Sequence, residues 1–154
     1  MELVKALTET SSLLAASRDK SELFHNLLER TVYESASEIG AICEINSTDR
    51  PEVLFCSKGQ NKEYTLLLEQ DLKGFLDECG EYVVSHRGVD GPFSSLLLDS
   101  ELMSAVAYPF YSKGKFTGLL ILNGREDFYY SKTRLSYLDS VCRVAQFRLD
   151  ALAE

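Results

Sequence analysis

The chain has 154 residues and a mass of 17.3 kDa, which suits one domain, or one domain with a short extension, and allows a hydrophobic core without metal or disulfide links. Hydrophobic residues make up 45% and charged residues 26%, so wholesale disorder is excluded. Sixteen Lys and Arg against twenty-four Asp and Glu give a net charge of −8, which argues against nucleic acids and anionic membrane surfaces as partners.

The cysteines and the apolar runs indicate the compartment. The longest apolar runs, near 66–68 and 119–122, are too short to span a membrane, and the first five residues do not resemble a secretory signal. We therefore expect a cytoplasmic protein. The four cysteines, at positions 43, 56, 79 and 142, form no CxxC pair and, with the two histidines, no zinc-like spacing, so free thiols and no metal site are expected.

Two helices are predicted at the N-terminus. Leu3, Leu7, Thr10 and Leu14 are spaced by four, three and four residues, which predicts a helix over 3–16. Its apolar stripe is narrow and suits a helix that leans on a partner helix. Further along, Asp19 followed by Glu22 is typical of a capping box and predicts the start of a second helix that ends near Glu38.

The period then changes from that of a helix to the alternation of a strand. Residues 39–45 and 53–56 predict two strands, and the polar turn cluster between them predicts an antiparallel hairpin. Three shorter elements are expected after this hairpin: a helix at 66–79, a strand at 82–84 and a short helix at 93–103.

The clearest pair of strands comes next. The apolar runs 105–111 and 116–122 are separated by a short turn that contains Gly114, which predicts a second hairpin. Both runs are apolar on both faces, so this part of the sheet should be covered on both sides. Pro109 predicts a sheet edge or a bulge at its position, because proline cannot donate to the strand ladder.

The last predicted helix begins at Ser131, an N-cap candidate, and carries two apolar stripes. The first stripe is Leu135, Leu138, Cys142, Ala145, Leu149 and Leu152, and the second is Tyr137, Val141, Val144 and Ala151. Together they are wider than contact with a sheet alone requires. We therefore expect a partner helix, either the 3–16 helix of the same chain or its copy in a second subunit.

The order of these elements predicts an α+β fold with a central antiparallel sheet of five to six strands, and not a doubly wound parallel sheet. Motifs for catalysis are missing. Two distant histidines give no spacing for a Ser-His-Asp triad, and Gly88 and Gly91 are not followed by the Lys-Ser/Thr of a phosphate-binding loop. We therefore assign no catalytic residue and expect no enzymatic activity.

At this point the chain resembles a GAF domain, over about residues 18–153. The helical stretch 23–28 that runs into 36–41 is similar to the first helix and strand of that family. The segment 104–110, with Pro109, and the later Gly114 and 117–122 are similar to the family's S-x-x-x-x-P-h…G-x-x-x-G-h-h-h-h hairpin.

Phe128, followed by the leucines of the last helix, resembles the family's approach to that helix. On this basis residues 1–17 are an N-terminal helix for dimerisation or linkage, and residues 18–154 are the GAF-like domain. PAS-like and profilin-like sheets share the architecture and are the structural alternatives.

The resemblance implies that the first and last helices pack on one face of the sheet and often dimerise, while the opposite face and its loops enclose a small-molecule pocket. Family members bind cyclic nucleotides, bilins, haem, nitrate or amino-acid-like ligands, and many have no known ligand. We therefore expect a sensory or regulatory domain that forms a homodimer and controls an attached or partner kinase, cyclase or transcription factor. The ligand and any cofactor are not indicated.

Three subgroup signatures are missing. The cyclic-nucleotide signature N-K-x-n-F-x-x-x-D-E is absent, and no Cys-His pair of the bilin-binding kind occurs. In the loop where the reductases of free methionine sulfoxide carry a thiol, this chain has Asp90. A ligand-free dimerisation scaffold is therefore the main alternative and a thiol-dependent reductase a remote one, with a redox role of Cys43, Cys56 or Cys79 left open.

The resemblance also gives candidate residues, each weighed against a plain structural role. The candidate pocket residues are Phe55, Phe75, His86, Arg87, Phe93, Asp99, Ser104 and Tyr108. Arg87 would pair with an anionic ligand, His86 would donate a hydrogen bond, and the hydroxyls of Ser104 and Tyr108 need partners if buried. The candidate dimer residues are Leu3, Leu7, Leu14, Tyr137, Val141 and Val144.

Overall fold

The computed structural model describes residues 2–45, 51–58, 83–86, 97–98 and 101–153. Within these ranges the chain forms helices and strands in the order that the sequence predicts. The elements are α1 (Leu3–Ala15), α2 (Lys20–Ser35), β1 (Ile39–Ile45), β2 (Pro51–Cys56), β3 (Val83–His86), β4 (Ser104–Ser112), β5 (Lys115–Gly124) and α4 (Lys132–Leu152). The predicted helix at 66–79 lies outside the described residues, and the described part of 93–103 is not helical.

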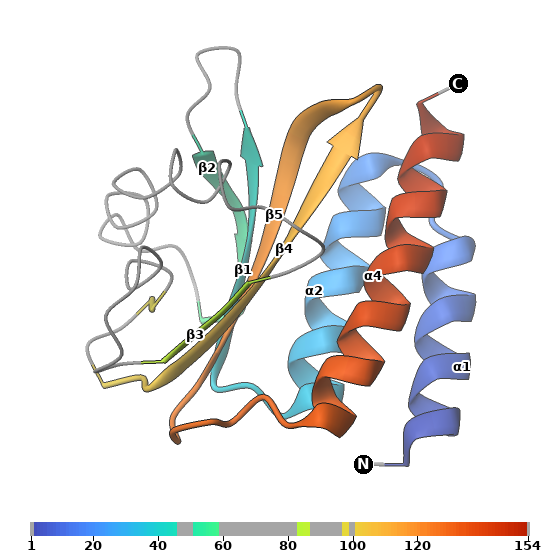
Figure 1. The fold of residues 1–154 in the computed structure, drawn as a ribbon. Helices are drawn as coiled ribbons and strands as arrows, with labels where there is room; N and C mark the ends of the chain where they lie inside the picture. The colour runs from blue at the N-terminus through green and yellow to red at the C-terminus, as the bar shows by residue number, and fades with distance from the viewer. Residues whose placement is uncertain (1, 46–50, 59–82, 87–96, 99–100, 154) are drawn as a thin grey trace.

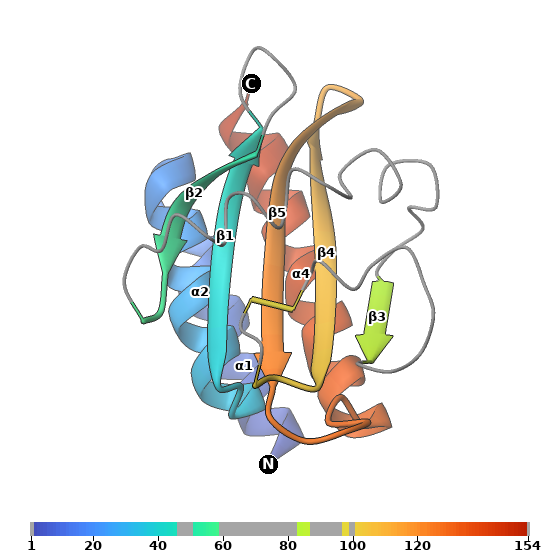
Figure 2. The same ribbon diagram turned by 90° about the vertical axis from the view of Figure 1, so that its left-hand side faces the viewer.

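The five described strands form one antiparallel sheet in the order β2-β1-β5-β4-β3, which Figure 2 shows from the side away from the helices. Both predicted hairpins are present, as β1–β2 and β4–β5, and β1 pairs with β5 in the centre. The prediction of an α+β fold with an antiparallel sheet is confirmed.

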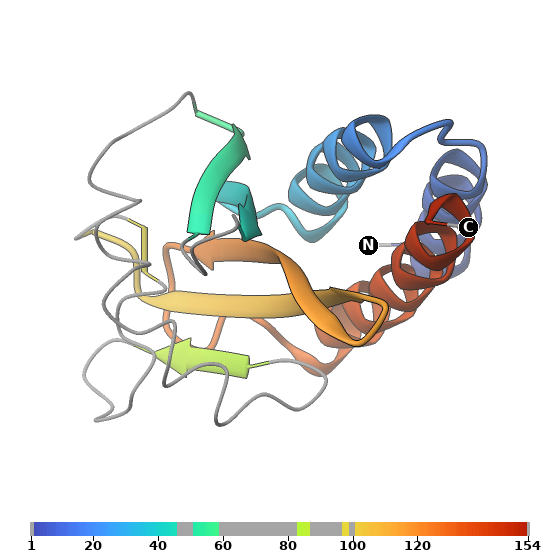
Figure 3. The ribbon, with the colours of Figure 1, turned by 90° about the horizontal axis from the view of Figure 1, so that it is seen from above.

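The described helices α1, α2 and α4 lie on one side of the sheet (Figures 1 and 3). α2 and α4 pack against the strands, and α1 lies against α4 and α2. β4 shows how alternation divides the sheet between two faces. Val106, Tyr108 and Phe110 join the core on the helix side, whereas Ala105 and Ala107 join a second core on the opposite face.

N-cap side chains set the starts of α2 and α4 as predicted, whereas α2 ends at Ser35 and not near Glu38. The side chain of Asp19 accepts a hydrogen bond from the Glu22 backbone N–H at 2.8 Å, and Ser131 accepts one from Arg134 N–H at 3.3 Å. Soon after α2 the chain enters β1, whose second residue is Gly40. A Cβ added to Gly40 would lie 2.7 Å from Val32 Cγ2 and 2.8 Å from Leu122 Cδ2, so the close approach of α2 to the sheet requires glycine there.

Among the residues that the structure describes, no strand pairs with β4 on the β3 side at Pro109, where its residue type predicts an edge or a bulge. β3 pairs with β4 only from Ser104 to Ala107, so Pro109 lies beyond the last pair that β3 makes. A bulge follows between Phe110 and Tyr111. The Gln146 side chain then supplies both partners to the Tyr111 backbone, accepting from its N–H at 2.9 Å and donating to its C=O at 2.7 Å. An amide from α4 thus replaces a neighbouring strand.

The partner helix of α4 is α1 of the same chain. Thr10 Oγ1 and Tyr137 Oη share a buried hydrogen bond of 2.9 Å, and Arg148 donates from Nε to the carbonyl oxygen of Ser17 at 2.9 Å. This contact decides between the two alternatives that the apolar stripes of α4 leave open, because α1 packs against α4 where Tyr137 and Val141 of the second stripe are fully buried.

The burial of the candidate dimer residues follows from that packing. Leu14, Tyr137 and Val141 have no exposed surface, so they contact α1, α2 and α4 neighbours within the chain and cannot reach a second subunit in this structure. Leu3, Leu7 and Val144 are only half-buried. This corrects the expectation for the first three residues: their apolar side chains serve the fold of the single chain.

The buried tyrosines of this helical layer give a pH prediction. Burial raises the pKa of Tyr137 to about 12 and also raises the pKa of Tyr130. In the unfolded chain both phenols ionise near pH 10, so the unfolded state loses protons first. The contribution of these two phenols to the free energy of unfolding should therefore stay level up to about pH 9 and fall as the pH rises from about 10 towards 12.

The measurement is urea unfolding between pH 8 and 11.5 for the wild type, Tyr137→Phe and Tyr33→Phe. Tyr137→Phe should show a smaller alkaline fall, because it removes one of the two phenols. Tyr33 is 72% exposed, so its replacement should leave the pH profile unchanged. An identical alkaline fall in Tyr137→Phe and the wild type would contradict the prediction.

Candidate functional site

On the sheet face away from the helices, mostly small side chains of β1 and β4 lie on either side of larger side chains of β5. In the register of the three central strands, Ile121 of β5 lies between Ala41 of β1 and Ala107 of β4. In the next row Asn123 lies between Ile39 and Ala105. Three of the four neighbours of β5 in these rows are alanines, so the side chains of β1 and β4 on this face are mostly short. We call the face the hollowed floor (Ile39, Ala41, Cys43, Ala105, Ala107, Leu119, Ile121).

A segment of the chain covers part of the hollowed floor and is tied to it by a hydrogen bond. Leu97, Leu98 and Leu102 pack against the floor. The backbone N–H of Leu98 donates to Asn123 Oδ1 at 2.6 Å, and Asn123 is fully buried. This polar side chain at the end of an apolar strand therefore holds the cover on the sheet.

Asn123 is a candidate functional residue that the sequence reasoning missed. The sequence does indicate its position. Asn123 follows the apolar run of β5, and by the alternation of the strand it lies on the same face as Leu119 and Ile121. The need for a hydrogen-bond partner at that point became visible only when the 97–98 segment was placed above it.

The described thiols are free and two of them are deeply buried. Burial raises the pKa of Cys43, on the hollowed floor, to about 12, and burial also raises the pKa of Cys142 on α4. Both thiols therefore stay protonated at neutral pH, where a nucleophile or a metal ligand would need the thiolate. Cys56 is half-buried, and Cys79 lies outside the described residues.

The described candidate pocket residues do not come together on the hollowed floor. The Ser104 hydroxyl donates to the carbonyl oxygen of Glu126 at 2.7 Å and accepts from Tyr129 N–H at 3.2 Å, so it fastens the connection from β5 to α4. Tyr108 and Phe55 pack in the helix-side core. The expectation that these two aromatic residues line a pocket on the other face is therefore not met, because their strand positions point them towards the helices.

His86 ends β3 and pairs in register with Ser104. The other candidate pocket residues, Phe75, Arg87, Phe93 and Asp99, lie outside the described residues. Among the residues that the structure does describe, no three His, Cys, Asp or Glu side chains gather in a group that could hold a metal ion. No helix in the described ranges has the length and apolar character to cross a membrane.

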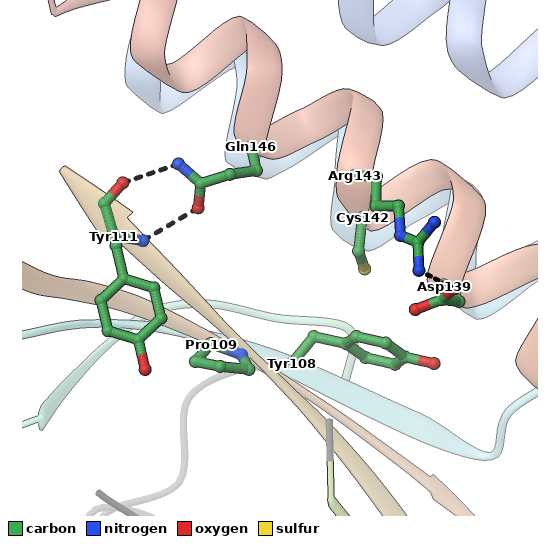
Figure 4. Close-up of a pocket in the computed structure, with 7 residues that line it drawn as sticks. All are labelled: Tyr108, Pro109, Tyr111, Asp139, Cys142, Arg143 and Gln146. Carbon is green, nitrogen blue, oxygen red and sulfur yellow. Dashed lines mark hydrogen bonds and ion pairs between the residues drawn. The ribbon is translucent and has the colours of Figure 1, made fainter. Parts of the chain in front are cut away.

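Tyr108 instead lines a pocket of about 250 Å³ between β4 and α4 (Figure 4). Its other lining residues are Pro109, Tyr111, Asp139, Cys142, Arg143 and Gln146. The polar groups engage one another: Arg143 pairs with Asp139 at 3.1 Å, and Gln146 holds the Tyr111 backbone. The ion pair lies within α4, and the two Gln146 hydrogen bonds join α4 to β4.

Phe55 lies on β2, in a groove of about 610 Å³ between α2 and that strand. Its ring meets the His25 ring edge-on with the centroids 5.2 Å apart, and His25 Nε2 lies 3.4 Å from Glu29. Phe55 on β2 and Tyr108 on β4 are thus separated by β1 and β5 and line different grooves.

Comparison with solved structures identifies the architecture. The chain superimposes on the GAF domain of an Acinetobacter phosphoenolpyruvate-protein phosphotransferase with a TM-score of 0.73 and 15% identity, covering 95% of this chain and 91% of that one. The fold is GAF-like. The resemblance seen in the sequence is confirmed at the level of the fold.

Two further solved structures with a similar fold come from proteins whose names describe different functions. The photosensory core module of a Stigmatella aurantiaca phytochrome matches with a TM-score of 0.71 and 11% identity over 96% of this chain, which spans 36% of that protein. The free methionine-R-sulfoxide reductase of Neisseria meningitidis matches with a TM-score of 0.69 and 14% identity, covering 97% and 89% of the two chains. No protein-family model matches the sequence, and no curated protein is similar to it in sequence.

Proposed function

We propose that this GAF-like chain is a sensory or regulatory domain that binds a small molecule on the hollowed floor, dimerises through its helical face and controls an output module. The hollowed floor beneath the tethered 97–98 segment is the observation that carries the proposal. Small side chains in the middle of a sheet provide depth for a guest, and ligand pockets are concave and largely apolar with few polar groups. Asn123 supplies such a polar group.

β4 provides the route by which a guest on the floor would affect α4. Ala105 and Ala107 face the floor, while Tyr108 and Phe110 face the helices from the same strand. Gln146 of α4 is also hydrogen-bonded to the β4 backbone. A guest that favours one position of β4 therefore favours one position of α4, which is the requirement for coupling two sites.

The output is proposed to be an attached or partner kinase, cyclase or transcription factor, and no catalytic step is assigned to this chain. The GAF-like neighbours in a phosphotransferase and a phytochrome support a regulatory role as part of larger signalling proteins. The residues of the hollowed floor are at most 2% exposed. This burial favours the alternative of a ligand-free scaffold.

The reductase neighbour makes thiol chemistry the remote alternative. The raised pKa of Cys43 speaks against it for this floor thiol, because the thiolate fraction at pH 7 is very small. A reduction assay with free methionine sulfoxide, run beside the binding screen, tests this alternative directly.

The binding proposal is tested by thermal shift with cyclic AMP, cyclic GMP, the amino acids, nitrate and biliverdin as probes. A probe at 100 times its dissociation constant adds about 2.7 kcal/mol to the stability of the folded state, which raises the melting temperature by about 5–10 °C. Ala107→Val fills the floor with two methyl groups, and Val106→Ile adds one methyl on the helix side of the same strand as the matched control.

A probe whose shift is lost in Ala107→Val and kept in Val106→Ile supports the site. A shift that Ala107→Val leaves unchanged would place the ligand away from the floor and overturn the proposed site. The absence of any shift across the panel favours the scaffold.

A further inference from the structure

The groove between α2 and β2, with a volume of about 610 Å³, combines apolar walls with aromatic rings and a carboxylate. We call the residues that carry this chemistry the α2–β2 groove (His25, Leu28, Glu29, Val32, Tyr33, Phe55). Leu28 and Phe55 pack in the helix-side core, whereas the hollowed floor belongs to the core on the opposite face of the sheet. The groove is therefore separate from the ligand site proposed above.

The carboxylate of the groove lies between two ring-bearing side chains of α2. His25, Glu29 and Tyr33 follow one another at intervals of four residues, so they lie in a line along the helix, about 6 Å apart. The Glu29 carboxylate lies 3.4 Å from His25 Nε2, which is longer than a charge-assisted hydrogen bond, and its side chain is 66% exposed. Glu29 can therefore contact a bound cation without giving up a strong contact within the chain.

A cation already lies against an aromatic ring in this groove. The guanidinium carbon of Arg30 is 5.3 Å from the centroid of the Tyr33 ring, within the range of a cation–π contact, and Tyr33 is still 72% exposed. Arg30 also pairs with Glu34 and lies 3.6 Å from Glu9. With Glu29, three carboxylates surround one guanidinium at this part of α2. The local charge therefore favours a further cation and disfavours an anion.

We infer that the α2–β2 groove binds a small quaternary ammonium cation such as choline, with its charge beside Glu29. The inference goes beyond the proposed function and does not depend on it. Quaternary ammonium groups are recognised by aromatic rings, because their methyl groups carry the positive charge and make no hydrogen bonds. In the groove these methyl groups contact the Tyr33 ring and the apolar walls formed by Leu28, Val32 and Phe55.

The test is an NMR titration of the backbone amides with choline chloride, exchanged for sodium chloride so that the ionic strength stays constant. The amides of α2 and β2 should shift with a dissociation constant in the millimolar range. The neutral carbon isostere of choline, dimethylbutanol, has the same shape without the charge and should bind at least about fivefold more weakly. Phosphocholine, the form that a lipid headgroup presents, should also bind more weakly, because its phosphate is repelled by the carboxylates.

Two variants test the groups that recognise the cation. Glu29→Gln should weaken choline binding about threefold to fivefold, because it removes the charge and keeps the shape. Tyr33→Leu should weaken it about threefold, since it keeps an apolar side chain and removes the ring. Both positions are exposed, so circular dichroism should show an unchanged fold.

The matched controls change the same net charge or the other face of the sheet. Asp150→Asn, on an exposed position of α4, and Ala107→Val, on the hollowed floor, should each leave choline binding unchanged. Equal binding of choline and dimethylbutanol, tighter binding of phosphocholine, or no shift of the α2 and β2 amides overturns the inference. A loss of binding in Ala107→Val with none in Glu29→Gln also overturns it and places the cation on the hollowed floor. A failure of this inference leaves the ligand site on the hollowed floor untouched in every other case.

Discussion

Replacing Phe24 by alanine is expected to lower the free energy of unfolding by about 3–5 kcal/mol, a large part of the stability of a domain of this size. Phe24 has no exposed surface and projects from α2 onto the sheet. Its ring lies 5.7 Å from the Phe110 ring of β4, and its Cζ lies 3.0 Å from the position of a Cβ on Gly118 of β5. The truncation would leave a cavity where α2 meets both strands.

Tyr33→Ala is the matched control, because Tyr33 lies on the same helix with 72% of its surface exposed. Urea unfolding followed by circular dichroism should show a change of less than about 1 kcal/mol for this variant. If Phe24→Ala cost no more than Tyr33→Ala, α2 would not form one cooperative unit with the sheet, and the fold described here would be contradicted at that contact.

Asn123→Leu is expected to lower the free energy of unfolding by about 1–3 kcal/mol and to loosen the cover of the hollowed floor. Leucine has a similar size but no acceptor, so the buried N–H of Leu98 loses the bond that it makes with Asn123 at 2.6 Å. An unpaired buried donor carries the full cost of its desolvation. The loss is local, so it should appear first in the 97–98 segment.

Hydrogen exchange measured by NMR resolves this effect. The Leu98 amide should exchange at least tenfold faster in Asn123→Leu than in the wild type. The amides of the β1–β5 pair should change their exchange rates only as far as the free energy of global unfolding changes. Asn26→Leu is the control, since Asn26 is half-buried on α2 and its amide donates only to Ser17 Oγ at 3.1 Å. Equal protection of Leu98 in Asn123→Leu and the wild type would show that Asn123 does not hold the cover.

Phe24→Ala and Asn123→Leu also distinguish an effect on the whole fold from an effect on the proposed ligand site. Phe24 lies on the helix side, so its loss weakens the whole domain, whereas Asn123 lies on the floor side and its loss acts on the cover. A ligand that binds the floor should be affected by Asn123→Leu well before the protein unfolds.

The elements of the fold were predictable because each depends on residues close together in the sequence. The Asp19 and Ser131 caps fix where α2 and α4 begin, and β1 has the bounds that its apolar run predicts. Pro109 predicted an edge or a bulge; the described part of β3 ends before it, and a register shift follows between Phe110 and Tyr111. Hydrogen bonds and caps of this kind are satisfied by neighbours within a few residues, so a local pattern is enough to specify them.

The site was less predictable, since it depends on which face of each strand meets the helices. Ser104 and Tyr108 were assigned to the pocket together because buried hydroxyls need partners. The structure gives Ser104 partners in the connection from β5 to α4 and turns Tyr108 towards the helix side. Alternation shows that Ala105 and Ala107 face opposite to Tyr108, but it does not show which of the two faces the helices cover.

The sequence by itself determined the order of helices and strands, the absence of known subgroup signatures and the excess apolar width of α4. Only the tertiary structure decided that α1 of the same chain covers that excess, and that Leu14, Tyr137 and Val141 are therefore internal. The same holds for Asn123, whose partner Leu98 lies 25 residues away in the sequence. The periodicity of a sequence shows how wide the apolar face of a helix or strand is. Which other element covers that face depends on contacts between distant parts of the chain.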